Sequence, residues 1–337
     1  MAESPKTAVK IVFGAMTLGK PGAEQARVHS LEDCAAILDV FQKYGHKEID
    51  TAIVYGGGSS EEYLGQLHWQ DRGIVMDTKF SPKANLGLEP GVQSTHRPEH
   101  LRLALKRSLA SLKTEKVDMW YLHAPDRTTP YEDTLREVNN LHKEGYFRRF
   151  GISNFMSWEV AQMVEICDRN GWIKPTAYQG VYNALHRGVE SELFPCLRKY
   201  GISFYEFNPL AGGYLTDRYH RDTADHEEGS RFDPKRNQGQ NYRSRYWNDE
   251  YFDALDILRP VAKKHGLSEA ECALRWMTNH SQLKRENGDA IIIGASSAKQ
   301  LEENLANLEK GPLPDDVVKA FDDGWARVKG VCANYFH

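Results

Sequence analysis

The 337-residue sequence predicts an α/β protein, in which eight strands alternate with helices and close into a (β/α)8 TIM barrel. Three observations support this prediction. Short apolar runs recur along the chain, helical patterns separate them, and no change of composition marks a domain boundary. We therefore expect one barrel domain over residues 1–337, with extended loops at the C-terminal face of the barrel.

The apolar runs indicate strands that are buried on both faces, because most of them are nearly continuous and end in a polar residue. They cover residues 9–16, 47–52, 73–80, 117–124, 148–154, 176–183, 203–210 and 290–297.

Between the strands, apolar residues recur at helical spacing. The first helical segment opens with Ser30 as an N-cap and ends at Gly45, and the second has Pro98 near its start. The expected helices cover residues 30–45, 97–113, 134–145, 157–171, 189–201, 251–266, 268–280 and 297–311.

One long polar segment, residues 216–250, shows no apolar periodicity. Loops of this length in compact domains are usually functional or disordered. The segment contains Tyr242, Tyr246 and Trp247, and such aromatic residues are uncommon in disordered chains. It follows the seventh strand, so we expect a lid over the cofactor or substrate more than a mobile insertion.

The bulk properties exclude several classes of protein. The net charge of −4 does not suit a nucleic-acid-binding surface, and no run of 18 apolar residues predicts a membrane span. The N-terminal stretch does not resemble a secretory signal. The five cysteines are scattered, so neither a disulfide framework nor a metal site is expected. A cytoplasmic protein is the expected outcome.

Active sites of such barrels lie at the C-terminal ends of the strands, where this chain carries a series of polar residues. They are Asp50, Tyr55, Lys79, His123, Ser153, Asn154, Gln179, Asn208, Ser296 and Ser297.

The first four of these residues suit the reduction of a carbonyl group. An ammonium such as Lys79 lowers the pKa of a nearby phenol, and Asp50 would keep Lys79 charged. Tyr55 would then donate a proton to the carbonyl oxygen, while His123 hydrogen-bonds that oxygen. Each residue alone has an ordinary structural explanation, and only their joint placement favours catalysis.

Three glycines, residues 56–58, follow Tyr55 and allow either a phosphate-binding loop or a sharp turn. No G-x-G-x-x-G pattern opens a helix here, so the turn is favoured. We expect Ser59 or Ser60 to cap the following helix, with Glu61 and Glu62 in its first turn.

Several strand-end motifs resemble those of the aldo-keto reductase superfamily. They are DTAIVYGGGSSEEYLG (50–65), TKF (78–80), YLHAPD (121–126), GISNF (151–155) and YQGVYN (178–183). The segments NPLAGGYLTDRY (208–219), YRSRYWND (242–249), GASSAKQLEENL (294–305) and CANYFH (332–337) are most similar to the aflatoxin aldehyde reductase branch, which is succinic semialdehyde reductase-like.

The resemblance implies a barrel that binds extended NADPH and reduces aldehydes and ketones, with Tyr55, Asp50, Lys79 and His123 as the catalytic tetrad. It places Tyr205 or its neighbours beneath the nicotinamide ring. The implied cofactor-binding residues are Met16, Asp50, Ser153, Asn154, Gln179, Asn208, Pro209, Leu210, Gly212, Leu215, Arg218, Arg231, Ser296, Gln300, Glu303 and Asn304. The implied substrate contacts are Tyr55, His123, Arg243, Arg245 and His337.

The chain departs from that branch at two positions. Asp217 and Arg218 stand where the branch has Gly-Lys, and His337 stands where its mammalian members have an arginine associated with carboxylated aldehydes. The expected partner is a small carbonyl compound, and a homodimer is possible because members of this branch are often dimers.

Two other functions remain open at this stage. One is a cofactor-sensing subunit of a potassium channel, although little sequence precedes the first strand. The other is a barrel lyase or isomerase that uses no nicotinamide.

Overall fold

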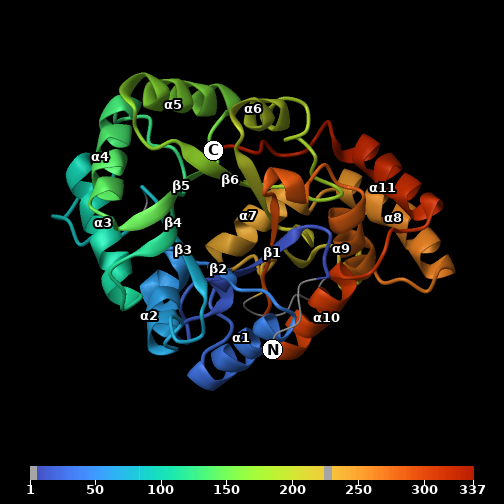
Figure 1. The fold of residues 1–337 in the computed structure, drawn as a ribbon. Coiled ribbons are helices and arrows are strands. Elements are labelled where there is room, and N and C mark those ends of the chain that lie inside the picture. Colours follow the sequence, from blue (N-terminus) through green and yellow to red (C-terminus); the bar gives the residue numbers. More distant parts are fainter. Residues whose placement is uncertain (1–5, 83, 224–229) are drawn as a thin grey trace.

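The structure is a computed structural model that describes residues 6–82, 84–223 and 230–337. Its centre is a closed barrel in which parallel strands follow one another in chain order and β8 pairs with β1 (Figure 1). The strands are β1 (Lys10–Gly14), β2 (Glu48–Asp50), β3 (Val75–Phe80), β4 (Val117–Leu122), β5 (Phe147–Ser153), β6 (Pro175–Val181), β7 (Ser203–Phe207) and β8 (Ala290–Ile293). The predicted (β/α)8 barrel is confirmed.

Most of the helices surround the barrel on its outer side, whereas α7 (Asn237–Tyr246) lies over its opening (Figure 1). In α1 (Leu31–Lys43), the side chain of Ser30 accepts a hydrogen bond from the backbone N–H of Asp33, so the predicted N-cap is confirmed. The other α-helices in the described residues are α2 (Ser59–Gln66), α3 (Pro98–Ser111), α4 (Tyr131–Lys143), α5 (Ser157–Asn170), α6 (Leu193–Tyr200), α7 (Asn237–Tyr246), α8 (Asp249–Lys264), α9 (Glu269–Asn279), α10 (Ala298–Leu308) and α11 (Asp315–Val328). Short 3-10 helices are η1 (Ala15–Thr17), η2 (Tyr55–Gly58), η3 (Ala211–Gly213) and η4 (Arg285–Asn287).

Two helices differ from the sequence prediction. Helix α11 lies beyond the last expected helix and packs against α8. Helix α7 forms inside segment 216–250, of which residues 224–229 lie outside the described residues. The sequence does not predict α7, because the helix is polar and lacks the usual apolar periodicity. Aromatic rings hold it in place instead: Tyr246 is fully buried and stacks on Tyr214.

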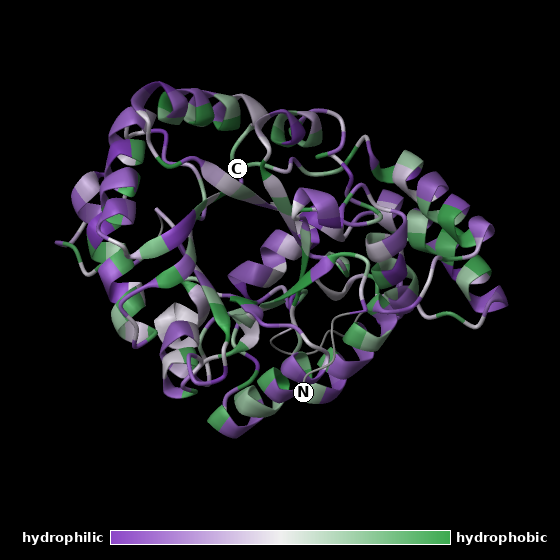
Figure 2. Cartoon of the chain, in the orientation of Figure 1, coloured by the Kyte–Doolittle hydropathy of each residue, from purple (hydrophilic) through white to green (hydrophobic). Residues whose placement is uncertain are grey.

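Apolar side chains fill the space on both sides of the strands. Inside the barrel lie Val12, Met119, Tyr121, Ala177, Tyr205, Ala290 and Ile292. A larger cluster fills the layer between the barrel and the helices. Figure 2 shows hydrophobic and hydrophilic residues mixed along these helices, as expected when each has one buried face. In the described parts of the chain, no helix is both long and apolar enough to cross a membrane.

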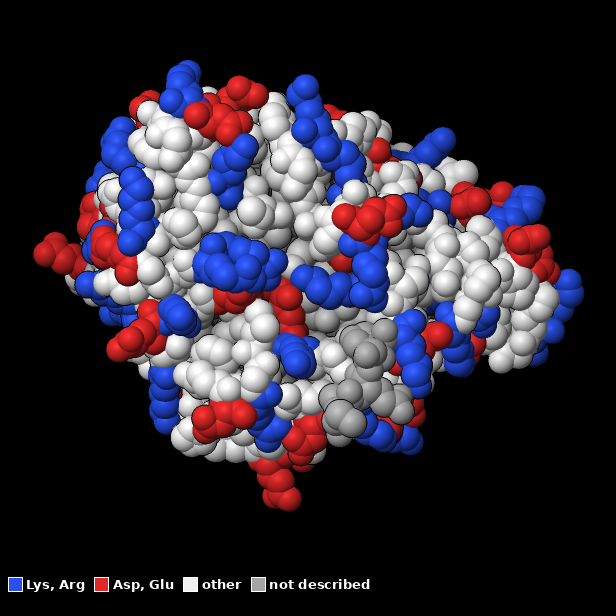
Figure 3. Space-filling model, viewed as in Figure 1, with Lys and Arg blue, Asp and Glu red and all other residues white. Residues whose placement is uncertain are grey.

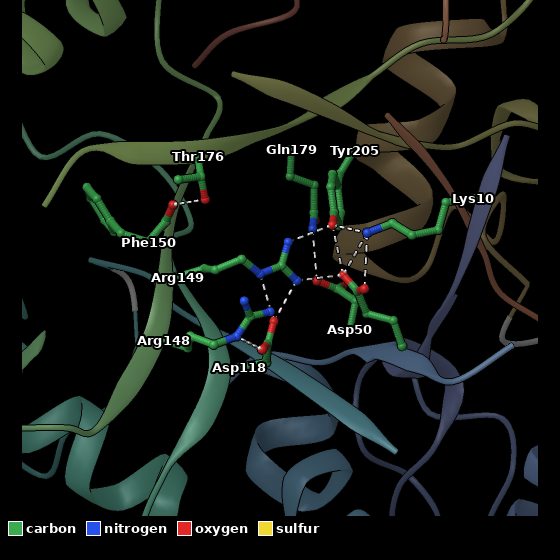
Figure 4. Close-up of polar contacts among 10 residues, drawn as sticks. Lys10, Asp50, Asp118, Arg148, Arg149, Phe150, Thr176, Gln179 and Tyr205 are labelled. Atoms are coloured by element: carbon green, nitrogen blue, oxygen red, sulfur yellow. Dashed lines mark hydrogen bonds and ion pairs between the residues drawn. The ribbon is translucent and has the colours of Figure 1, made fainter. Parts of the chain in front are cut away.

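Charged residues close the N-terminal end of the barrel. Lys10 of β1 donates to Glu48 of β2 at 3.0 Å. Arg149 of β5 donates to Glu48 at 3.1 Å and to Asp118 of β4 at 2.7 Å. The hydroxyl of Tyr205 on β7 donates to Glu48 at 2.9 Å (Figure 4). Figure 3 shows Lys and Arg side chains gathered at the centre of this face.

Glu206, a buried acid in the barrel wall, lacks a hydrogen-bond partner among the described residues. Glu206 on β7 is fully buried, and neither of its carboxyl oxygens has a hydrogen-bond partner among the described residues. Tyr205 faces the barrel interior, so its neighbour Glu206 faces the surrounding helices. Burial alone raises the pKa of Glu206 well above its ordinary value. The shift favours the protonated form of this side chain, and its burial without a partner costs stability.

We expect Glu206→Leu to raise the free energy of unfolding at pH 7 by about 1–3 kcal/mol, because it removes a buried polar group that has no partner. Urea unfolding measures the change. The gain should shrink below about pH 4.5, where the unfolded chain also keeps this glutamate protonated. The matched control is Glu115→Leu at an exposed position, which should change stability little. A lower stability for Glu206→Leu would show that the carboxyl group has an important partner.

Candidate active site

The C-terminal ends of the strands surround a cavity of about 870 Å³. Asp50 ends β2, Lys79 lies near the end of β3 and Gln179 lies near the end of β6. Tyr55 begins the η2 turn that follows β2, and His123 follows β4. All of these except Lys79 line the cavity, so the structure brings together the residues that the sequence singles out.

A buried ion pair forms the base of the site. Lys79 is completely buried, and its Nζ lies 2.5 Å from Oδ2 of Asp50, which is only 2% exposed. The same ammonium donates to the carbonyl of Thr51 at 2.6 Å. Gln179 donates to the other oxygen of Asp50 at 2.8 Å, a contact visible in Figure 4. Both oxygens of Asp50 are therefore engaged, which fixes the carboxylate and so the position of Lys79.

Tyr55 lies directly beside this ion pair. Its hydroxyl hydrogen-bonds to Lys79, whose Nζ is 4.8 Å from the centre of the tyrosine ring. Burial raises the pKa of Tyr55, and the opposing effect of Lys79 does not outweigh it. The expectation of a lowered pKa is therefore wrong, because it neglects burial. Tyr55 keeps its proton at neutral pH, as a proton donor must.

The charge on Lys79 survives its burial. Burial acts to lower the pKa of Lys79, but the nearby Asp50 and Tyr55 outweigh it, so the net shift is upward. Burial also raises the pKa of Asp50, while Lys79 and Gln179 favour its ionised form. The pair is best described as an ammonium held by a carboxylate.

His123 faces Tyr55 across the cavity. The two rings meet edge to face, with their centres 5.7 Å apart. Burial, together with the charge of Lys79, holds the pKa of His123 well below its ordinary value. The imidazole is therefore neutral at pH 7, and its Nδ1 has no partner among the described residues.

The glycine run after Tyr55 forms a turn, as predicted. Residues 56–58 all have positive φ angles, which only glycine adopts at little cost, and α2 begins immediately afterwards. Glu61 and Glu62 lie in the first turn of α2, as predicted, but the predicted serine cap is wrong. Ser59 instead donates to Gly56 O at 2.6 Å and Ser60 to Ala15 O at 2.9 Å, so both hydroxyls hold the turn in place.

Two asparagines at strand ends adopt left-handed backbone conformations. Asn154, with φ of 66°, donates to His123 O at 2.8 Å, which ties the loop after β5 to the loop after β4. Asn208, with φ of 70°, accepts a hydrogen bond from the hydroxyl of Tyr242 at 2.8 Å. His337 donates its backbone N–H to Asn154 O at 3.2 Å, so the C-terminal residues reach the same cavity.

Most residues with an implied cofactor role line the cavity. These are Met16, Asp50, Asn154, Gln179, Asn208, Pro209, Leu210, Gly212, Arg218, Arg231, Ser296 and Gln300. Of the implied substrate contacts, Tyr55, His123, Arg245 and His337 line it as well.

Five residues with implied roles do not line the cavity: Ser153, Leu215, Arg243, Glu303 and Asn304. Ser153, Leu215 and Asn304 are buried, and Glu303 is exposed on α10. Arg243 donates to Phe232 O at 2.7 Å and lies 4.2 Å from the centre of the Trp247 ring. Their roles in binding stay predictions.

The resemblance places Tyr205 or one of its neighbours beneath the nicotinamide ring, and Tyr205 itself does not line the cavity. Its hydroxyl contacts Glu48 and Arg149 at the N-terminal end of the barrel, opposite the cavity. Its neighbour on the same face of β7, Phe207, lines the cavity instead.

Two residues that line the cavity, Glu24 and Gln238, were not predicted from the sequence. The loop after η1 contributes Glu24, and helix α7 contributes Gln238. The backbone N–H of Gln238 donates to Glu24 at 3.2 Å, and its side chain lies 3.8 Å from the sulfur of Met16. Described residues of segment 216–250 thus line part of the cavity, at the place where its length, its position after the seventh strand and its aromatic residues led us to expect a lid.

Comparison with known proteins shows the family to which the sequence is similar. The sequence model of the Aldo/keto reductase family matches residues 10–326. An aldo-keto reductase of Pseudocercospora fijiensis is 55% identical over 300 residues, which is 89% of this chain and all of that protein. The aldo-keto reductase pigE of Monascus ruber is 48% identical over 99% of both chains. The human protein named aflatoxin B1 aldehyde reductase member 2 is 42% identical over all of this chain and 92% of its own length.

The barrel and its buried lysine–aspartate pair beside a tyrosine define a class of barrel enzyme, an oxidoreductase. The chain belongs to the aldo/keto reductase family.

We expect Lys79→Met to lower the free energy of unfolding by about 3–5 kcal/mol, because it leaves the buried carboxylate of Asp50 without its ammonium. Adding Asp50→Asn should recover part of the loss. Urea unfolding of the parent, both single variants and the double variant yields the coupling energy between the two groups. Lys116→Met, at an exposed position, is the control. Additive effects of the two changes would contradict a strongly coupled buried pair.

Proposed function

We propose that this protein reduces the carbonyl group of aldehydes and ketones to an alcohol, with NADPH as its cofactor and Tyr55 as the proton donor. One observation carries the proposal: the hydroxyl of Tyr55 contacts the buried Lys79–Asp50 pair while Tyr55 lines a large cavity. The name of the human relative, an aldehyde reductase, is consistent with this proposal.

The cavity lining fits an elongated cofactor that carries phosphate groups. Arg218 and Arg231 line it, and so does Gln300 at the start of α10, whose helix N-terminus favours anions. Asn208 also lines the cavity, and its buried Nδ2 has no hydrogen-bond partner among the described residues. Such an amide suits a phosphate or hydroxyl acceptor that only a bound group supplies.

We assign the ends of the cofactor by the chemistry of these side chains. Arg218, Arg231 and Gln300 would hold its phosphate groups. Asn154 and Gln179 would hold the nicotinamide amide, because both carry amide groups next to the tetrad. When bound, the reduced nicotinamide supplies a hydride to the carbonyl carbon.

The side chains of the protein manage the proton and the charge. Tyr55 gives its phenolic proton to the carbonyl oxygen as negative charge develops there. Lys79 stabilises the phenolate that remains, and Asp50 keeps Lys79 charged and in position. His123 is neutral and can donate a ring N–H to the same oxygen. Solvent then returns a proton to Tyr55.

Other cavity residues would contact the rest of the substrate. Val54 and Phe336 provide apolar surface, while Arg245 and His337 provide polar groups. We therefore propose substrates with an apolar body, for which 2-nitrobenzaldehyde and 9,10-phenanthrenequinone are suitable probes.

We expect Tyr55→Phe to reduce kcat for these probes by roughly 10²–10⁴-fold, because the proton donor is lost. Binding of NADPH should remain, as measured by quenching of the fluorescence of the seven tryptophans. Tyr63→Phe is the matched control, because its hydroxyl donates to the backbone carbonyl of His29, away from the cavity. Full turnover by Tyr55→Phe would refute the assignment of the proton donor.

We expect Arg231→Met to weaken the binding of NADPH by about 10- to 100-fold, the usual cost of losing a hydrogen bond between charged groups. Fluorescence titration gives the Kd. Arg148→Met removes an arginine at the opposite end of the barrel and serves as the control. Equal Kd values for the parent and Arg231→Met would place the phosphates elsewhere. Absence of quenching in the parent would instead favour a barrel enzyme without nicotinamide.

A further inference from the structure

A buried carboxyl group lies behind the tetrad, on the outer face of β3. Glu61, in the first turn of α2, is only 1% exposed. Its Oε1 accepts a hydrogen bond from the hydroxyl of Thr78 at 2.5 Å, and Ser108 of α3 contacts the same carboxyl group. Its Oε2 has no hydrogen-bond partner among the described residues. A buried carboxylate usually has more donors than this, so the ionised form is poorly stabilised here.

Glu61 is connected to the active site through β3. Thr78 immediately precedes Lys79, and successive side chains of a strand point to opposite faces. Thr78 therefore contacts Glu61 outside the barrel, while Lys79 contacts Asp50 and Tyr55 inside it. Lys79 thus lies between two acids on opposite sides of one strand.

The charge on Glu61 changes near neutral pH. Burial raises the pKa of Glu61 to about 7, against the opposing effects of Thr78, Ser108 and Lys79. The elements packed most closely on α2 are α1, α3, η1 and η2, and β3 reaches it through Thr78. Among the ionisable groups of the described residues, only the ammonium of Lys79 acts on this carboxyl group, because α3 presents the neutral Ser108. Glu62, in the same turn, points to solvent and pairs with Lys20.

We propose that Glu61 is a positioning residue of the reductase reaction, which sets the strength of Tyr55 as a proton donor through Lys79. When Glu61 loses its proton, its negative charge offsets part of the field of Lys79 at Tyr55. Tyr55 then becomes a weaker acid, and reduction slows. The inference rests on the proposed function, and it gives this enzyme a dependence on pH that the tetrad alone does not supply.

The test compares pH profiles of kcat/KM for carbonyl reduction between about pH 5.5 and 8.5. For the parent we expect a roughly two- to fivefold fall centred near pH 7, the size expected of one added charge near Lys79. Glu61→Gln, which keeps the size and the acceptor of the side chain but cannot ionise, should show no such fall. Glu62→Gln, the exposed neighbour, should keep the parent profile. An unchanged fall in Glu61→Gln would overturn the proposal.

A second measurement does not depend on turnover. Because folding raises the pKa of Glu61 from 4.5 to about 7, the parent should lose stability relative to Glu61→Gln as pH rises through this interval. Parallel stability curves would show that Glu61 does not titrate there, and the inference would be wrong. If the curves diverge but the parent reduces no carbonyl compound, the charge change stands and the proposed function alone fails.

Thr78→Val keeps the experiment decisive if Glu61→Gln does not fold. It removes the hydroxyl that favours the ionised carboxylate but leaves Lys79 in place. We expect the inflection of the kcat/KM profile to move to higher pH. An inflection at the parent position would overturn the proposal.

Discussion

The ion pair between Lys79 and Asp50 is the interaction on which the active site depends. Both charges are withdrawn from water, which costs several kcal/mol per ion unless each is matched by partners. The structure supplies them: Lys79 also donates to Thr51 O, and Asp50 also accepts from Gln179. The pair gives Tyr55 an ammonium neighbour that does not depend on solvent pH near neutrality. Tyr55, which lies beside this ammonium, keeps its proton at neutral pH because its pKa is raised.

The parallel barrel treats its two ends differently. At the C-terminal end the strand termini hold Asp50 and Gln179 at the cavity wall, with Lys79 buried behind Asp50. At the N-terminal end the charged side chains are paired with one another across the axis (Figure 4). Strands position the polar groups of the site, while loops and α7 cover them. Changes in these loops can alter which substrate binds without moving the groups on the strands.

The sequence predicts the barrel and the convergence of Asp50, Tyr55, Lys79 and His123 well, because parallel strands bring their C-terminal ends together wherever they pair. The sequence does not predict which way a side chain points or whether a charged residue is buried. Alternation places Tyr205 inside the barrel but does not say to which end its hydroxyl points. Helix α7 was not predicted from the sequence, because Tyr242 and Tyr246 pack it in place of the usual aliphatic residues. Glu61 and Glu206 look like surface acids, since only the packing of neighbouring elements shows that both are buried.

The network at the N-terminal end has a consequence for the kinetics of folding. Lys10, Glu48, Asp118, Arg149 and Tyr205 come from five different strands, and Lys10 is 195 residues from Tyr205. Contacts so distant along the chain form only when the first and last parts of the barrel meet, which is a late event. Interactions absent from the transition state slow unfolding and hardly affect the folding rate. We therefore expect this network to slow the unfolding of the closed barrel and to have little effect on its folding rate.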